Sequence, residues 1–232
     1  MKATGDRKTA VVTGVLFLVT EVAAIAGMLL YRPALDGAAY VAGSGAAGRG
    51  ADGRVAAGAL CEVVLVLAVI GTGVALYPVL RRHQEALALG YVCGRLLEAA
   101  VIAVGIVSVL AVVTLRQDAG AGAATAARAL VAVHDWTFLL GPNVVLGANS
   151  LALAFLMHRS RLVPRPVALL GLIGGPLILA SAVAVLFGLY PQVSTIGSLA
   201  ALPVFAWEVT LAVRLLTKGF TPAAHRPVVL AS

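Results

Sequence analysis

The apolar run from Ala10 to Tyr31 places the strongest constraint on the fold, because its only charged residue is Glu21. A helix that crosses a membrane needs about 20 predominantly apolar residues, whereas the apolar region of a secretory signal peptide has about 7 to 15. We therefore expect this run to be a membrane helix and not a cleaved leader. The whole chain is 61% hydrophobic and 12% charged. Soluble domains have roughly 45 to 50% apolar residues, so the composition indicates a membrane protein.

Five more apolar segments follow the first, and polar or Gly- and Pro-rich stretches separate them. The sequence therefore predicts the all-α class, with a polytopic membrane bundle of six transmembrane helices in one domain over residues 1–232. The predicted helices cover about residues 10–31, 55–80, 86–115, 128–157, 166–189 and 196–217. Pro33 is expected to mark the exit from the first helix. The third helix is long enough to tilt or to project from the bilayer.

The distribution of Lys and Arg predicts the orientation of the bundle. The N-terminus, the turns at 81–85 and 158–165 and the C-terminus hold eleven of these residues, whereas the loops on the other side hold five. Short loops rich in Lys and Arg stay in the cytoplasm. We therefore expect a multi-pass protein of the cell membrane with both termini cytoplasmic. The formal charge of +7 then reflects topology, and we expect no nucleic-acid partner.

The fourth apolar segment gathers more polar chemistry than any other. His134, Asp135 and Trp136 are adjacent in it, and Pro142 and Asn143 follow. A proline in mid-helix lacks the backbone N–H that would bond the carbonyl four residues earlier. We expect a kink at this point, with the Asn143 side chain or a water molecule bonding the freed carbonyl.

Other apolar segments carry acids at a similar or greater depth. At about 1.5 Å of rise per residue, Glu21, Glu98 and Glu208 fall near the middle of a hydrocarbon core about 30 Å thick. Glu62 and the adjacent histidine and aspartate of the fourth segment fall about two turns from the outer end. One outward-lying cavity inside the bundle is therefore expected to contain all these polar groups.

The acids outnumber the cations inside the predicted helices. An ionised residue that faces lipid costs about 3 kcal/mol even on a lenient insertion scale, so such residues normally face inward and pair. Arg95 is expected to pair with Glu98, three residues later on the same face, or with an acid on a neighbouring helix. The remaining acids must be protonated, hydrogen-bonded to His134, solvated in the cavity or bound to a cation.

These polar groups and the aromatic residues beside them make up the candidate site. We expect acid–base catalysis from Asp135, His134, Glu208, Glu98, Glu62 and Glu21, and substrate binding by Arg95, Trp136, Phe138, Asn143 and Trp207. Structural interpretations stay open. Arg95 and Glu98 would equally fit an interhelical clasp, Trp136 a residue at the membrane interface, and Asn143 a hydrogen bond between helices. No histidine or cysteine motif specifies a metal and no phosphate loop appears, so we expect neither a metal nor a cofactor.

The sequence also resembles one family along nearly its whole length. The resemblance rests on five stretches: RKTAVVTGVLFLVTEVAAIAG, GALCEVVLVLAVIGTGVALYPVLRRHQEALALGYVCGRLLEA, HDWTFLLGPN, RSRLVPRPVALLGLIGGP and LPVFAWEVTLAVRLLTKGF. Together they resemble the bacterial integral membrane proteins of domain-of-unknown-function family 4386. The resemblance implies a six-helix integral membrane protein, and it carries no activity that can be transferred to this chain.

Three functions fit these observations. The first is a membrane-embedded isomerase, cyclase or hydrolase that applies carboxylate and histidine chemistry to a lipophilic substrate, such as an isoprenoid or a lipid. The second is a proton- or cation-coupled transporter of a small solute. The third is a structural accessory subunit whose charges fasten helices together. Membrane lipid is the expected partner in all three, and a homo-oligomer would double the six helices available to a transporter.

Overall fold

Helices account for the regular structure in the computed structural model, which describes residues 2–43, 50–118 and 120–221. In chain order they are α1 (Lys2–Leu35), α2 (Gly37–Val41), α3 (Ala51–Leu80), α4 (Glu85–Asp118), α5 (Ala123–Leu139), the π-helical segment η1 (Leu140–Val145), α6 (Leu146–Ser160), α7 (Arg165–Leu186) and α8 (Thr195–Thr217). Arg49 and Arg226, which contribute to the Lys and Arg counts above, lie outside the described residues.

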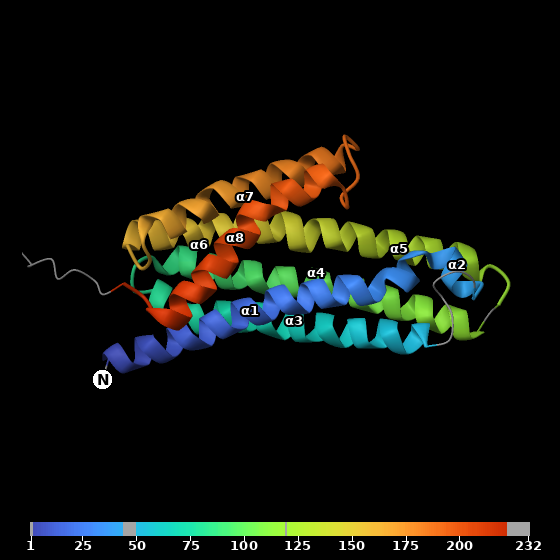
Figure 1. Cartoon of the computed structure of the whole chain (residues 1–232), viewed down its shortest axis with the longest axis horizontal. Coiled ribbons are helices and arrows are strands. Elements are labelled where there is room, and N and C mark those ends of the chain that lie inside the picture. Colours follow the sequence, from blue (N-terminus) through green and yellow to red (C-terminus); the bar gives the residue numbers. More distant parts are fainter. Residues whose placement is uncertain (1, 44–49, 119, 222–232) are drawn as a thin grey trace, which may run out of the picture.

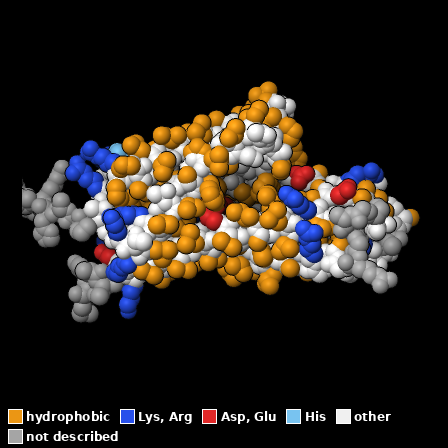
Figure 2. Space-filling model, in the orientation of Figure 1, with side chains coloured by type: hydrophobic (Ala, Val, Ile, Leu, Met, Phe, Trp, Pro, Cys, Tyr) orange, Lys and Arg blue, Asp and Glu red, His pale blue; other side chains and the backbone are white. Residues whose placement is uncertain are grey.

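Six helical stretches of the described chain are long and apolar enough to cross a membrane. They are Asp6–Leu35, Ala51–Leu80, Glu85–Asp118, Ala123–Ser160, Arg165–Leu186 and Thr195–Thr217, the fourth comprising α5, η1 and α6. Figure 2 shows a broad apolar band on the surface between two ends that carry Lys and Arg side chains. The predicted number of membrane spans is therefore confirmed.

The spans are arranged as a ring of neighbouring helices (Figure 1). Each span packs against the next along the chain, and α8 returns to pack against α1. The short α2 lies against α5 at one end of the bundle, here named the α2 end. The opposite end, named the terminal end, carries the beginning of α1 and the end of α8. At their connection, α7 and α8 stand apart from the rest of the bundle in Figure 1, because they pack on α6 and α1 rather than on α5.

At two of the prolines that lie inside helices, a nearby side chain bonds the carbonyl that the proline leaves without a backbone donor. Pro33 lies inside α1, which ends at Leu35 instead of at the proline as the sequence suggested. The carbonyl of Leu29, four residues before Pro33, accepts a hydrogen bond of 3.1 Å from Arg54 Nη2. In the same way, the carbonyl of Phe138 accepts a bond of 3.0 Å from Asn143 Nδ2 beside Pro142, within the η1 region. The side-chain amide thus satisfies the carbonyl as expected, and the local geometry is π-helical.

A polar cluster closes the α2 end. The Tyr40 hydroxyl on α2 donates to Asp52 Oδ1 on α3 at 2.6 Å, and Arg116 Nη1 on α4 donates to the same oxygen at 2.9 Å. The Arg116 guanidinium also lies 4.6 Å from the centre of the Tyr40 ring. Burial, together with the hydrogen bond to Asp52, raises the pKa of Tyr40 to about 12, so the hydroxyl keeps the proton that it donates. This cluster holds α2 against the beginning of α3 and the end of α4, in a region that lies beyond the predicted spans.

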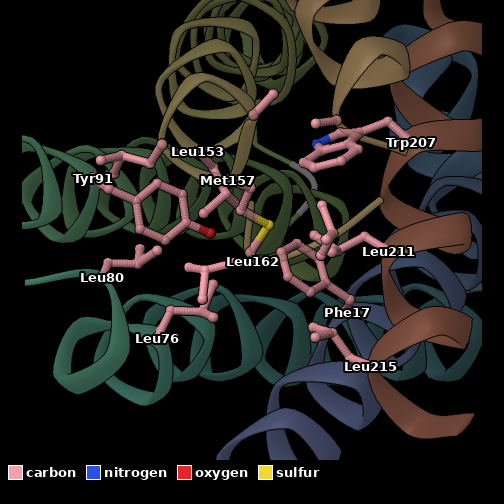
Figure 3. Packing of buried hydrophobic residues seen from close by; sticks show 14 of the residues in the cluster. Phe17, Leu76, Leu80, Tyr91, Leu153, Met157, Leu162, Trp207, Leu211 and Leu215 are labelled. Atoms are coloured by element: carbon pink, nitrogen blue, oxygen red, sulfur yellow. The ribbon is translucent and has the colours of Figure 1, made fainter. Parts of the chain in front are cut away.

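Buried apolar side chains form two clusters along the bundle. The cluster at the terminal end lies between α1, α3, α4, α6 and α8 (Figure 3), and its largest members are Phe17, Leu76, Leu80, Tyr91, Leu153, Met157, Trp207, Leu211 and Leu215. The second cluster, towards the α2 end, includes Tyr31, Val55, Ile102, Ile106 and Val109. Arg95 contacts members of the first cluster, and residues of the second line the adjacent cavity. The buried charges therefore lie where the two clusters meet.

Glycines allow α7 to approach its neighbours closely. A Cβ atom at Gly174 would lie 2.6 Å from the backbone nitrogen of Val204 on α8, and one at Gly175 would lie 2.8 Å from the carbonyl oxygen of Gly147 on α6. Backbone atoms cannot move aside as a flexible side chain can. Small residues at such crossings are the usual means by which membrane helices pack.

We predict that Gly174→Ala lowers the free energy of unfolding by about 1 to 3 kcal/mol, because the added methyl group overpacks the α7–α8 contact. Gly90→Ala is the matched control, since nothing lies within 4 Å of a Cβ atom at that helical position. The control should be neutral or stabilising by up to about 1 kcal/mol through helix propensity. Melting temperatures of the purified proteins in one detergent compare the two variants. Equal melting temperatures would contradict the proposed close contact.

Candidate functional site

Arg95 on α4 lies at the centre of the buried polar groups, with only 2% of its surface exposed. Its Nη1 donates to both carboxylate oxygens of Glu98 at 3.2 and 3.1 Å, and its Nη2 donates to Glu208 Oε1 at 2.9 Å. Its Nε donates to the Tyr91 hydroxyl at 3.0 Å. Every guanidinium nitrogen thus has a partner, and the ion pair with Glu208 joins α4 to α8.

Two aromatic rings and one amide complete the surroundings of this cation. The centres of the Phe17 and Tyr91 rings lie 5.5 and 5.4 Å from the guanidinium carbon, within the range of a cation–π interaction. Asn149 Nδ2 on α6 donates to Glu98 Oε2 at 3.0 Å. The Asn149 side chain passes over Gly94 of α4, where any Cβ atom would overlap it. The network therefore holds residues of α1, α4, α6 and α8 in one place.

Glu21 on α1 adds a third acid beside this network. It lines the same cavity as Glu208, the acid on α8 that pairs with Arg95. Two carboxylates that share one site repel each other when both are ionised, and a single proton held between them relieves that repulsion. Because Glu208 also pairs with the arginine, such a proton would lie beside a fixed positive charge in the interior of the bundle. Paired carboxyl groups of this kind are a recurrent device for acid–base chemistry.

These groups line a cavity of about 110 Å³, here named the inner chamber. Its polar wall consists of Glu21, Glu62, Arg95, Glu98 and Glu208, and most of the remaining wall is apolar. A cavity of this size with several polar groups holds more than one water molecule. The inner chamber can therefore admit either water or the reactive part of a small ligand.

A second cavity of about 70 Å³, named the outer chamber, adjoins the first. Glu62, Ile102, Phe138 and Pro142 line both chambers. Residues of α1, α5 and the α7–α8 connection complete the wall of the outer chamber. Figure 2 shows a hollow where this connection stands apart from the bundle, with apolar side chains around it and acidic ones nearby. The two chambers thus form a path from the apolar surface to the buried acids.

His134 and Asp135 lie at the outer chamber. His134 Nδ1 is 3.4 Å from Asp135 Oδ1, and their side chains are 14% and 64% exposed. The imidazole is stacked on the Phe138 ring with centres 6.3 Å apart, and it meets the Tyr31 ring edge-on at 5.8 Å. The histidine is therefore held by two aromatic rings, whereas the aspartate lies at the opening.

The two chambers bring together most of the residues predicted as a site. Those in the inner chamber are Glu21, Glu62, Glu98, Glu208 and Arg95; His134 and Asp135 line the outer chamber, and Phe138 lines both. The sequence predicted one cavity for all of them. The structure has two adjoining ones, whose walls share Glu62, Ile102, Phe138 and Pro142.

Three residues predicted to bind substrate lie outside both chambers. Trp136 is 52% exposed and borders a separate surface depression beside the α7–α8 connection. Trp207 is fully buried in the terminal-end cluster (Figure 3). Asn143 bonds the carbonyl of Phe138. Trp136 thus fits the interpretation as a residue at the membrane interface, whereas Trp207 packs in the core and Asn143 bonds within its own membrane span and not between helices.

The structure adds polar residues that the sequence did not single out as a site. Tyr91 lies one helical turn before Arg95 on the same face, a spacing that could have drawn attention to it. Asn149 on α6 bonds a carboxylate of the site on α4, and an amide within an apolar helix could have suggested a bond of this kind between helices. Tyr31 lies at the end of an apolar run, and nothing in the sequence distinguishes it from an aromatic at the membrane interface.

The site offers no ready set of metal ligands. Within residues 2–43, 50–118 and 120–221, no group of three or more His, Cys, Asp or Glu side chains is placed to hold a metal ion. Each of Glu98 and Glu208 already bonds Arg95. The chemistry that the chambers support is therefore that of carboxyl, phenol and imidazole groups.

Comparison with known proteins identifies a family. A family model described as "Domain of unknown function (DUF4386)" matches residues 12–219, a range that includes all residues of both chambers. Neither the curated proteins nor the solved structures contain a match to the chain. The match covers most of the sequence and agrees with the six membrane spans. The chain is therefore a multi-pass membrane protein that belongs to the DUF4386 family.

Proposed function

We propose that the protein is a membrane-embedded enzyme that isomerises or cyclises a lipophilic, unsaturated substrate by transferring protons. The observation that carries the proposal is that Glu21 and Glu208 line one chamber beside Arg95, and that this chamber adjoins a largely apolar cleft. A proton held beside an apolar space with little water suits transfer to a carbon–carbon double bond. The apolar mouth of the outer chamber supports entry of the substrate from the membrane.

The proposed reaction needs no external reagent. The proton of the carboxyl pair moves to one carbon of a double bond, whose π electrons form the new C–H bond. The neighbouring carbon becomes a cation, which the nearby carboxylates stabilise. A proton then leaves an adjacent carbon, directly or after ring closure, and the electrons of its C–H bond restore a double bond. The departing proton returns to a carboxylate, so the product is an isomer. The protein regains its starting state once a proton has passed from that carboxyl group back to the pair of Glu21 and Glu208.

The surroundings assign different roles to the acids. Glu208 is held by Arg95, and Glu98 balances the charge of that arginine, so this pair positions the proton donor. Glu62 lines both chambers and forms no hydrogen bond within the described residues. It is therefore the acid with freedom to accept the departing proton. His134 and Asp135 at the opening exchange protons with solvent in this scheme.

The apolar packing at the terminal end supports an enzyme over a carrier. Large, fully buried side chains of the terminal-end cluster pack together on that side of the bundle (Figure 3), and two of them, Phe17 and Tyr91, contact Arg95. A carrier would need a polar path through this region in another conformation. The excess of acids makes a proton- or cation-coupled carrier the second candidate. Proton flux in vesicles that Glu208→Gln abolishes, without any isomerised product, would favour the carrier.

We predict that the protein incorporates deuterium from D₂O into carbon-bound positions of a lipophilic substrate. Protein in lipid nanodiscs is incubated with a bacterial lipid extract and unsaturated isoprenoid alcohols, and the extracted lipids are compared by mass spectrometry. Glu208→Gln and Glu21→Gln should each reduce the label by at least about 100-fold, since general acid catalysis contributes about 10² to 10⁴. Glu85→Gln, at an exposed glutamate away from both chambers, is the matched control.

Two results of this experiment would contradict the proposed isomerase. The first is equal labelling in wild type and both variants, which would assign the exchange to the solvent or the lipids. The second is label only from H₂¹⁸O, which would move the reaction to hydrolysis.

We predict that Arg95→Met destabilises the protein by about 3 to 5 kcal/mol, because it leaves two buried carboxyl groups without their cation. Combining it with Glu98→Gln and Glu208→Gln should restore most of the stability, since the unpaired charges are then absent. Melting temperatures of the single and triple variants provide the measurement. If the triple variant regains stability and keeps wild-type deuterium labelling, the charges act only as a structural clasp.

We further propose that both termini face the cytoplasm, on the strength of the Lys and Arg distribution. A green fluorescent protein fused to the C-terminus of the full-length chain should then be fluorescent. Alkaline phosphatase fused to the same terminus should be inactive. Alkaline phosphatase fused after residue 120, in the α4–α5 connection, should be active. The reverse pattern of activities would refute this orientation.

A further inference from the structure

Three polar side chains meet in the outer chamber without strong protein partners. The Tyr31 hydroxyl is buried, in a residue only 1% exposed, and has no hydrogen-bond partner among the described residues. The Glu62 carboxyl also forms no hydrogen bond in the described part of the chain. Among the described residues, the His134 side chain has only its long contact of 3.4 Å with Asp135 as a hydrogen-bond partner. All three residues line the same chamber, whose other walls are largely apolar.

Two glycines leave the space that the side chains of Tyr31 and Glu62 occupy. A Cβ atom at Gly27 of α1 would collide with the Glu62 carboxyl group of α3, and one at Gly58 of α3 would lie 2.9 Å from the Tyr31 ring of α1. Each glycine stands four residues before the polar residue of its own helix, so the arrangement is reciprocal across the antiparallel pair. The two glycines therefore leave space between α1 and α3 for a phenol and a carboxyl group at the same depth in the bundle.

A buried hydroxyl without a partner costs about 1 to 3 kcal/mol, so a partner from outside the chain is expected to satisfy it. The Tyr31 hydroxyl has a proton to donate, and the Glu62 carboxylate needs a donor. An alcohol satisfies both, because its oxygen accepts from the phenol while its O–H donates to the carboxylate. An ether lacks the donor for the carboxylate, and an ammonium group lacks an acceptor for the phenol.

We propose that Tyr31, Glu62 and His134 form a head-group subsite that binds the hydroxyl end of a lipophilic alcohol. The inference rests on the proposed function, since it names the substrate class of the same cleft. The hydroxyl group lies between Tyr31 and Glu62, and the imidazole of His134 borders it, held by Phe138 and Tyr31. The carbons next to the hydroxyl extend past Phe138 and Pro142 into the inner chamber, towards the pair of Glu21 and Glu208.

Equilibrium binding of tritiated farnesol to the full-length protein in nanodiscs tests this subsite, after subtraction of binding to empty nanodiscs. Unlabelled farnesol, farnesyl methyl ether and farnesylamine compete for the site. Farnesol should compete at least about tenfold better than the ether, because a hydrogen bond to a charged group contributes about 1.5 to 3 kcal/mol and each 1.4 kcal/mol is tenfold.

Two variants separate the two hydrogen bonds. Tyr31→Phe should weaken farnesol and its methyl ether alike, by about three- to tenfold, because both offer an oxygen to the phenol. Glu62→Leu should weaken farnesol by at least about tenfold and leave the ether unchanged, because only the alcohol donates to the carboxylate. An apolar replacement of an acid in a membrane helix removes the cost of burying its charge, and the melting temperature of the variant verifies that it is folded. Tyr190→Phe is the matched control, since Tyr190 bonds Ser181 outside both chambers.

The outcomes that overturn the subsite are distinct. Equal competition by farnesol and its ether, saturable binding that neither variant changes, or no saturable binding would each refute it. Tighter binding of farnesylamine than of farnesol would make the chamber a cation site instead. The proposed function can fail separately. Selective binding of farnesol without any deuterium-labelled product would support the subsite and contradict the proposed enzymatic reaction.

Discussion

The pairing requirement of one buried guanidinium organises the interior of this protein. Arg95 is only 2% exposed, so protein groups from its own helix and from α8 compensate its charge. Glu98 and Glu208 supply the negative charges, and Tyr91 accepts from the remaining nitrogen. The bond to Glu208 joins α4 to α8, elements far apart in the sequence. The ring of helices is thus closed around a polar centre, while apolar packing completes it on either side.

Glycines determine where polar side chains enter the space between helices. Gly94 receives Asn149, Gly27 receives the Glu62 carboxyl group, and Gly58 receives the Tyr31 ring. In each case the glycine lies on one helix and the polar group on its neighbour. Close approach of small residues is normally a means of packing backbones in membranes. Here the same device admits polar side chains that would otherwise have to face lipid.

The sequence was sufficient for the spans and for most of the buried charges, and the reasons are physical. Long apolar runs have few alternatives to membrane helices, and an acid such as Glu208 within one must face inward. Pairing partners were harder to predict, because the i,i+3 spacing identifies Glu98 while the contact with Glu208 depends on how α8 packs. Trp207 was expected near a ligand and packs in the core, since an aromatic residue in an apolar run carries no sign of which face it occupies.

The asymmetry of the bundle limits how a proton in its centre can be replaced. Towards the terminal end, Arg95 meets packed aromatic and aliphatic side chains. Towards the α2 end, the inner chamber adjoins the outer one, and Glu62 lines both. In the proposed reaction, a proton given up by Glu21 or Glu208 is replaced through Glu62, by way of either solvent or a bound molecule. Because a hydroxyl group bound at Glu62 would block that route to solvent, an occupied outer chamber confines the proton to the substrate and the carboxyl groups. Such confinement favours a reaction in which the proton lost from one carbon is the proton regained by the protein.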